Sequence, residues 1–327
     1  MSESGTVSFL PRRTGALATV IQPRDGDLRH WGESDQASEI GYVKSRLENY
    51  PYQQLTIEFD QHERILWYFM APTDRPSTTV PLMRETRHLQ STIIDIFDQW
   101  SDPESQPIRF LVVGSRMPGI FNLGGDLELF AQLIRQRNRK ALVDYARLAI
   151  EVVHANTTCL ELPLITAAVV QGDALGGGFE AALSGNLIIA ERSAKFGLPE
   201  VLFNLFPGMG AYSFLSRKID PALAERMMLS GKIYSADELH DMGVIDVIAE
   251  DGAGEQTLYE YLIKHGRQFN AHRAIYDVRR RVNPVTFDEM SDITNIWVET
   301  ALRLRDEDVH RMERLAAAQL RRWNRDK

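Results

Sequence analysis

The stretch that decides the fold reads Gln171-Gly172-Asp173-Ala174-Leu175-Gly176-Gly177-Gly178-Phe179-Glu180. An apolar run over residues 164–170 comes directly before it and predicts a buried strand that ends at Gly172. The glycines allow a tight turn, and we expect a helix to begin within the triplet 176–178. A turn that enters a helix directs free backbone N–H groups outward, where they suit an anionic oxygen. The alternative, that the triplet is only a packing turn, stays open at this point.

Strands and helices alternate on both sides of this stretch. Apolar and alternating patterns predict strands at 55–60, 65–70, 108–114, 164–170 and 186–190, the first two joined into a hairpin by 61–64. Helical spacing predicts one helix from Pro81, a long helix from about Leu127 into the 150s, and a mostly helical chain from about Pro221 onward. Such alternation implies parallel βαβ units, so the expected fold class is α/β.

Composition narrows the kinds of partner and site. The net charge is −8 over 327 residues, which argues against nucleic acid as the main partner. Cys159 is the only cysteine, so neither an internal disulfide nor a cysteine-based metal site is expected. The N-terminus lacks the pattern of a signal peptide, and no apolar run is long enough to span a bilayer. We therefore expect a cytoplasmic protein with no membrane partner and no bound metal.

Two further segments carry candidate chemistry. Phe121-Asn122-Leu123-Gly124-Gly125-Asp126-Leu127 follows a predicted strand and enters a predicted helix. Gly197-Leu198-Pro199-Glu200 supplies a second carboxylate, whose direction a proline can help to fix, and it precedes Leu205-Phe206-Pro207-Gly208-Met209-Gly210. Each segment also has a plainer interpretation, because Asp126 can be a helix N-cap and a lone Pro-Glu is commonly a solvated loop. The evidence for a catalytic site comes from the order of the three segments along the chain, and not from any one of them alone.

This ordered set resembles the crotonase (enoyl-CoA hydratase/isomerase) superfamily. The resemblance covers roughly residues 50–265 and rests on the 121–127 loop, the glycine turn ending at Glu180, the later Pro199-Glu200 and the 207–210 turn. It implies that the N–H groups of Gly125 and Gly177 form an oxyanion hole for an acyl thioester. It also implies that Glu180 and Glu200 are the catalytic carboxylates.

The resemblance also implies an architecture. Repeated ββα and βαβ units are expected to form a spiral sheet core, followed by a C-terminal helical region that trimerises. The chain then divides into an N-terminal extension over 1–40 with little regular structure of its own, a crotonase-like catalytic core over 41–265, and a C-terminal helical region over 266–327. A homo-oligomer, trimer or hexamer, is expected.

A second resemblance is narrower than that to the superfamily. It is to the diffusible-signal-factor synthases, and it covers residues 119–127, 176–184 and 197–213. This implies a dehydratase that acts on 3-hydroxyacyl chains and a thioesterase that releases a cis-2-unsaturated fatty acid. Glu200 is then the base at Cα and Glu180 the acid at the 3-hydroxyl. The substrate would be an acyl thioester of phosphopantetheine, on acyl carrier protein or on CoA, and no other cofactor is implied.

The acyl chain needs a pocket near these groups. We expect it to be lined by residues of the loop and of the segment after Pro199, namely Asn122, Leu123, Leu198, Leu202, Phe206 and Met209. The alternative for the apolar members is ordinary core packing. An acidic carrier protein would dock on a basic patch, for which Arg267, Arg273, Arg279, Arg280 and Arg281 are candidates, with a solvated helix face as the alternative.

Two other functions remain open. An enoyl-CoA hydratase of fatty-acid metabolism would use the same glutamates, so these residues do not separate it from the synthase. A non-catalytic binding module of the same fold is the third possibility, and it has no need to keep both Glu180 and Glu200.

Overall fold

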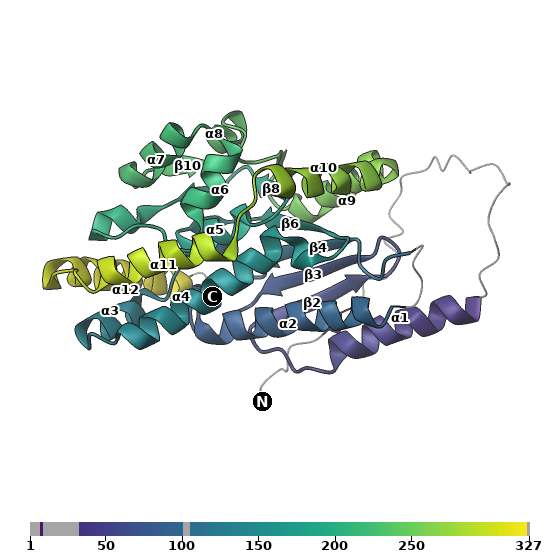
Figure 1. Ribbon diagram of the computed structural model, residues 1–327, viewed down its shortest axis with the longest axis horizontal. Helices are drawn as coiled ribbons and strands as arrows, with labels where there is room; N and C mark the ends of the chain where they lie inside the picture. The colour runs from purple at the N-terminus through teal and green to yellow at the C-terminus, as the bar shows by residue number, and fades with distance from the viewer. Residues whose placement is uncertain (1–6, 9–32, 101–104, 326–327) are drawn as a thin grey trace.

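A seven-stranded sheet forms the centre of the protein. The computed structural model describes residues 7–8, 33–100 and 105–325 (Figure 1). The strand order is β1-β2-β3-β4-β6-β8-β11. These strands are β1 (Val7–Ser8), β2 (Leu55–Asp60), β3 (Ile65–Met70), β4 (Phe110–Ser115), β6 (Ile165–Val170), β8 (Leu187–Glu191) and β11 (Val247–Ala249).

The pairing within this sheet confirms the predicted hairpin and the parallel core. β2 and β3 pair antiparallel, from Leu55 opposite Met70 to Asp60 opposite Ile65. From β3 through β4, β6 and β8 to β11, every pairing is parallel. Every residue of β3, β4, β6 and β8 is buried. Continuous apolar strands are expected where helices cover both faces of a parallel sheet.

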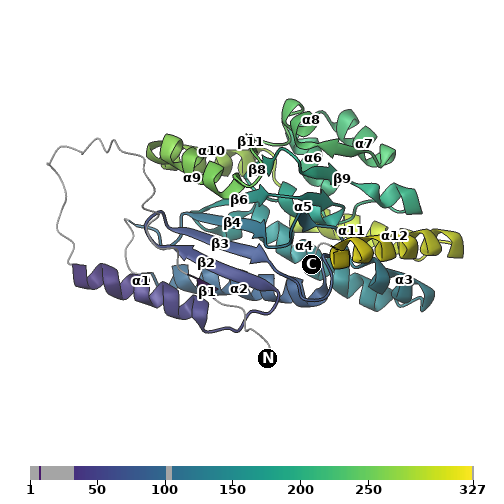
Figure 2. The ribbon, with the colours of Figure 1, turned by 180° about the vertical axis from the view of Figure 1, so that it is seen from behind.

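Helices lie on both faces of this sheet, and on the face seen in Figure 2 they lie toward β6 and β8, with no helix of the described residues in front of β2 and β3 (Figures 1 and 2). α2 (Val80–Asp98) and α4 (Arg139–Thr157) lie together on one face, and α1 (Glu33–Glu48) lies beside α2. On the other face, Leu258 and Leu262 of α9 (Gly254–His265) pack onto Trp67 and the sheet residues around it. Phe269 and Tyr276 of α10 (Phe269–Val282) join the same cluster.

A second, smaller sheet follows the ends of the central strands. Its order is β10-β9-β7-β5, with β5 (Ile120–Asn122), β7 (Asp173–Leu175), β9 (Lys195–Gly197) and β10 (Ile233–Ser235). β5, β7 and β9 come directly after β4, β6 and β8, and they pair parallel with one another. The chain thus repeats a pair of strands and then a helix, as the family resemblance implies. Strands of three residues are too short to show a period in the sequence, so they were not predicted.

Two local expectations need correction. The long helix expected from Leu127 is two helices, α3 (Leu127–Arg135) and α4, because Arg137 has a positive φ of 50° and the Asn138 side chain caps α4. α1 begins at Glu33, inside the segment 1–40 that was expected to have little regular structure. The rest of that expectation, apart from β1, falls on residues 1–6 and 9–32, which lie outside the described residues.

The chain from about Pro221 onward is mostly helical, as predicted, with β10 and β11 between the helices. Its core helices include α7 (Pro221–Ser230) and α8 (Ala236–Asp241), and α6 (Ala211–Lys218) comes before them. The C-terminal region contains the 3₁₀ helix η3 (Gly266–Gln268), α10, α11 (Phe287–Ala301) and α12 (Asp306–Arg325). α11 packs on α4 and α12 packs on α3, so this region returns to the core. Among the described residues, no helix combines the length and apolarity that crossing a membrane requires.

Candidate active site

The site lies where β4 and β6 end, because the two glycine loops that follow these strands meet there. Gly176 has a φ of +51°, and a methyl group in place of its hydrogen would lie 2.4 Å from Glu200 Oε1. At Gly178 the same methyl group would lie 2.1 Å from the backbone oxygen of Asn122. Only glycine permits these approaches, so the triplet is more than a flexible turn.

The two loops bring the amides of Gly125 and Gly177 close together. A methyl group on Gly177 would lie 3.5 Å from the amide nitrogen of Gly125. Gly177 is the first residue of α5 (Gly177–Leu183), where a helix leaves its N–H groups without an internal partner. Among the hydrogen bonds of the described residues, neither amide donates to a protein acceptor. Two free donors side by side are what an oxyanion needs.

Asn122 holds the first loop in this shape. Its side chain is 1% exposed, and its Oδ1 atom accepts hydrogen bonds from the Gly124 amide at 2.8 Å and from the Thr78 hydroxyl at 3.2 Å. Asp126 caps α3 by accepting from the Leu129 amide, and it also pairs with Arg75 at 2.9 Å. The plainer interpretation of Asp126 as an N-cap is therefore confirmed.

Glu180 projects from the first turn of α5 and is 1% exposed. Its Oε1 atom accepts hydrogen bonds from the amides of Met209, at 2.7 Å, and Ala211, at 2.9 Å. Ala211 is the first residue of α6, so the positive end of a helix dipole also faces this carboxylate. The Pro207–Gly210 turn therefore serves to stabilise a negative charge on Glu180.

Glu200 approaches from a different element and lacks such donors. It lies in the 3₁₀ helix η2 (Pro199–Phe203), which begins with the proline that sets its direction. The residue as a whole is half-buried, but its Oε2 atom is shielded from solvent and has no hydrogen-bond partner among the described residues. A buried carboxylate oxygen without a partner is costly when charged.

These surroundings act differently on the pKa values of the two carboxylates. Burial raises the pKa of Glu180, and the amides at 209–211 oppose this rise. Burial also raises the pKa of Glu200, and the neighbouring charge of Glu180 raises it further. Since one ionised carboxylate disfavours ionisation of the other, the second proton of the pair is harder to remove than the first. We assign the charge to Glu180, which has two donors, and the proton to Glu200, which has no partner at Oε2.

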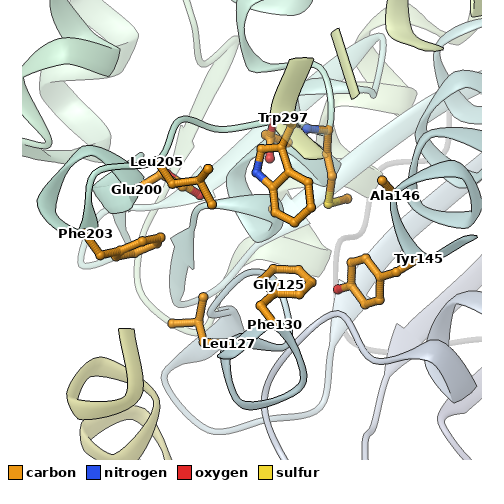
Figure 3. A pocket seen from close by; sticks show the side chains of 13 residues that line it. Gly125, Leu127, Phe130, Tyr145, Ala146, Glu200, Phe203, Leu205 and Trp297 are labelled. Carbon is orange, nitrogen blue, oxygen red and sulfur yellow. Dashed lines mark hydrogen bonds between the residues drawn. The ribbon is translucent and has the colours of Figure 1, made fainter. Parts of the chain in front are cut away.

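An apolar cavity surrounds the four groups (Figure 3). Its polar lining comes from Gly125, Gly177, Glu180 and Glu200. The remaining lining is apolar or backbone, from Leu127, Phe130, Tyr145, Ala146, Phe203, Leu205, Gly208, Met209 and Trp297. An apolar wall lowers the local dielectric constant and so strengthens charge interactions within the cavity.

The aromatic wall of this cavity comes from three helices. The Phe130 ring of α3 meets the Tyr145 ring of α4 edge to face at 4.7 Å and the Trp297 ring of α11 at 5.0 Å. Figure 3 shows these rings together on the side of the cavity away from Phe203. Sequence reasoning did not assign them to the site, because nothing local in the sequence places the C-terminal Trp297 beside Gly208.

The residues predicted to bind substrate divide into two groups. Met209 lines the cavity, where its Sδ atom lies close to Gly177. Leu198, Leu123 and Phe206 do not line it: the first two are buried in the core, and Phe206 packs partly buried against it. Leu202 is 58% exposed, and Asn122 faces its own loop. The cavity therefore gathers both glutamates, both glycines and Met209, whereas substrate binding by the other five stays a prediction.

Comparison with known protein families decides the affiliation. A family model described as enoyl-CoA hydratase/isomerase matches residues 88–282. The chain belongs to this family. The matched range contains both glycine loops and both glutamates of the cavity.

Curated members of the family resemble parts of the chain. Methylglutaconyl-CoA hydratase, mitochondrial, from Rattus norvegicus is 32% identical over 162 residues, which cover 50% of this chain and 49% of that protein. Cyclohexa-1,5-dienecarbonyl-CoA hydratase from Thauera aromatica is 39% identical over 120 residues, which cover 37% of this chain and 45% of that protein. The chain spans about half the length of the curated relatives it matches.

Solved structures of low sequence identity share the fold. An enoyl-CoA hydratase from Bacillus halodurans superposes with a TM-score of 0.67 at 20% identity and covers 80% of this chain and 99% of its own. Pseudomonas aeruginosa DspI gives a TM-score of 0.57 at 24% identity over 74% of this chain and 95% of its own. These likenesses concern the fold, and the narrower resemblance to diffusible-signal-factor synthases stays a prediction. The predicted cytoplasmic location also stays a prediction, since some relatives are mitochondrial.

Proposed function

We propose that the protein catalyses the reversible addition of water to an α,β-unsaturated acyl thioester of CoA. The observation that carries this proposal is one apolar cavity that holds two free amides beside one stabilised and one partnerless carboxylate. CoA is proposed because the curated relatives named above are hydratases of CoA thioesters. The reaction needs no metal and no further cofactor.

Each group has one task in the hydration direction. The amides of Gly125 and Gly177 donate to the thioester oxygen as negative charge develops on it, a contribution of about 3 kcal/mol per donor in comparable holes. Glu180 accepts a proton from water, whose oxygen forms a bond to Cβ. Glu200 donates its proton to Cα, which completes the addition. In the reverse direction, Glu200 removes the Cα proton and Glu180 protonates the departing hydroxyl, in the order that the resemblance implies.

The resting protonation state matches the one in which hydration begins. Hydration begins with a charged Glu180 and a protonated Glu200, and this is the arrangement that the Met209 and Ala211 amides stabilise. Dehydration begins with the proton on Glu180, where two N–H donors disfavour the neutral acid. The enzyme is therefore ready for an enoyl thioester without first moving a proton.

The test is a turnover assay with trans-2-enoyl-CoA substrates of several chain lengths. Wild-type protein is expected to consume the conjugated thioester and form the 3-hydroxyacyl product. Glu180→Gln and Glu200→Gln are each expected to lower kcat by about 10²–10⁴-fold, since each removes one proton transfer. Glu128→Gln, at a 69%-exposed side chain paired with Arg75, is the matched control and should keep full activity. Turnover that survives in both catalytic variants would contradict the proposal.

The narrower function adds a second step at the same site. A 3-hydroxyacyl chain on acyl carrier protein would be dehydrated to a cis-2-enoyl thioester, and water would then attack the thioester carbonyl to release the free acid. It is supported by the likeness of segments 119–127, 176–184 and 197–213 to the diffusible-signal-factor synthases. The 197–213 segment contains Glu200 and the amides that bind Glu180. Release of a free cis-2-enoic acid from 3-hydroxyacyl-carrier protein would establish this step. If no free acid is released, only the hydratase activity remains proposed.

A further inference from the structure

A second and larger cavity opens near the beginnings of the central strands, at the other end of these strands from the catalytic site. Its volume is about 640 Å³, and it lies between the end of α4, the end of α6, and α10 with the segment 283–286. Pro163 and Gly185 in its lining come just before β6 and β8 begin, whereas the catalytic loops follow the ends of β4 and β6. The two cavities share no lining residue. The second cavity is therefore separate from the catalytic site.

The lining of this second cavity is strongly basic. Six basic side chains and two acidic ones face it, in a chain whose net charge is −8. Glu289 and Asp246 pair with two of the basic groups from outside the lining, and the basic groups still outnumber the acidic ones. The basic residues are Arg217, Lys218, Arg273, Arg279, Arg280 and Arg281. A concave site of one charge sign concentrates ligands of the opposite sign.

Some of these cations are already fixed in place. Arg217 donates to both carboxylate oxygens of Glu289, at 3.0 and 2.7 Å, and to the backbone oxygen of Pro284 at 2.7 Å. Arg280 pairs with Asp277 one turn earlier in α10. Lys218 is 13% exposed and lies 3.7 Å from Asp246. Side chains held in this way lose little further freedom when a ligand binds.

Several basic side chains of the lining have no acidic partner. Among the described residues, Arg273, Arg279 and Arg281 form no ion pair with a carboxylate. Their guanidinium groups are therefore available to an anionic ligand, and charge-assisted pairs of this kind are the stronger hydrogen bonds in proteins.

We propose that this cavity binds a small ligand that carries phosphate groups. Guanidinium forks match phosphate oxygens two at a time, and the volume lies within the range of small-molecule sites. Leu183, Phe214 and Val285 supply an apolar part of the lining for the uncharged portion of the ligand. The concave shape favours a small molecule over the docking of a carrier protein, whose acyl group would also be needed at the other end of the central strands.

Calorimetric titration with ADP and with inorganic pyrophosphate tests this proposal. Wild-type protein is expected to bind at least one of these probes, more weakly as salt is raised. Tighter binding of ADP would identify a nucleotide as the ligand class, and equal binding would identify recognition of the phosphates alone. The double variant Arg273→Gln/Arg279→Gln is expected to weaken binding by at least about tenfold, since each lost charge-assisted hydrogen bond exceeds the free energy of a tenfold change.

Two controls define the site. Arg267→Gln removes an exposed arginine of η3 that does not line the cavity, and it should leave binding unchanged. Glu200→Gln alters only the catalytic cavity and should also bind the probe normally. If the double variant does not fold, Arg279→Gln alone, at an exposed position, replaces it. Absence of binding below about 1 mM in wild-type protein, or equal binding by the arginine variant, would overturn the proposal.

Discussion

At the scale of a single residue, the surroundings of Glu200 suit proton transfer but lower the stability of the folded protein when its carboxylate is charged. Its Oε2 atom is shielded and partnerless, while Glu180 receives the amides of Met209 and Ala211. The motifs predicted both glutamates as a pair, because each stands in a recognisable local pattern. The sequence could not show that backbone amides bind Glu180 and not Glu200, because this depends on which side chain the Pro207–Gly210 turn faces.

Glu200→Gln is expected to stabilise the protein at alkaline pH. The pKa of Glu200 is raised in the folded state, so the folded protein retains a proton that the unfolded chain loses. Stability therefore falls as pH rises from the ordinary carboxylate pKa through the raised one, and a neutral glutamine avoids this loss. Thermal unfolding should show a gain of about 1 kcal/mol at alkaline pH and almost none at acidic pH. A gain that is the same at every pH, or a loss at alkaline pH, would contradict the assignment.

At the scale of elements, local patterns predicted what is long and periodic. The 55–70 hairpin, the strands at β4, β6 and β8 and the helix that starts in the glycine triplet agree with the sequence. The break between α3 and α4 and the strands of the second sheet were missed. Those features depend on one residue in a left-handed conformation and on pairings between distant loops, neither of which gives a periodic signal.

The glycine turn should tolerate no side chain at its tightest point. Gly178→Ala places a methyl group 2.1 Å from the Asn122 backbone oxygen, so the loop that carries the Gly125 amide must move. We expect the free energy of unfolding to fall by about 3 kcal/mol and activity to fall with it. Gly266→Ala, at a position with no heavy atom within 4 Å, is the matched control. Denaturant unfolding of both variants gives the comparison, and equal effects would refute this account of the turn.

At the scale of the whole molecule, the C-terminal region completes the site. α11 returns across α4 and places Trp297 against Gly208 and Phe130 (Figure 3). The sequence predicted a helical region over 266–327 and its helical spacing, but not that Trp297 would form a wall of the catalytic cavity. These contacts join Trp297 to residues 89 and 167 positions earlier in the chain, and only the folded chain shows them.

Trp297→Ala should enlarge the catalytic cavity and change its chain-length preference. The substitution removes a 6%-exposed ring, and we expect a loss of about 4 kcal/mol in the free energy of unfolding. The ratio of kcat/KM for long against short enoyl-CoA substrates should rise. Ile296→Ala, the preceding residue of α11 with a 60%-exposed side chain, should alter neither quantity. An unchanged ratio in Trp297→Ala would show that the ring does not limit the acyl chain.

The oligomer implied by the family resemblance is a second prediction at this scale. Ile263 of α9 and Ile275, Val278 and Val282 of α10 expose apolar side chains, a pattern typical of contact surfaces. Light scattering is expected to find a trimer or a dimer of trimers for wild-type protein. The double variant Ile275→Asp/Val278→Asp should have a lower molar mass in solution. A monomeric wild-type protein would contradict this prediction.

The most direct test of the central claim is hydration of a trans-2-enoyl-CoA in ¹⁸O-labelled water, with mass spectrometry of the products. If Glu180 activates water and Glu200 protonates Cα, the 3-hydroxyacyl-CoA should carry one ¹⁸O atom at its hydroxyl. This labelled product should disappear in Glu180→Gln and in Glu200→Gln and persist in Glu128→Gln. Label found only in the carboxylate of a free acid, or hydration that continues in both catalytic variants, would contradict the account.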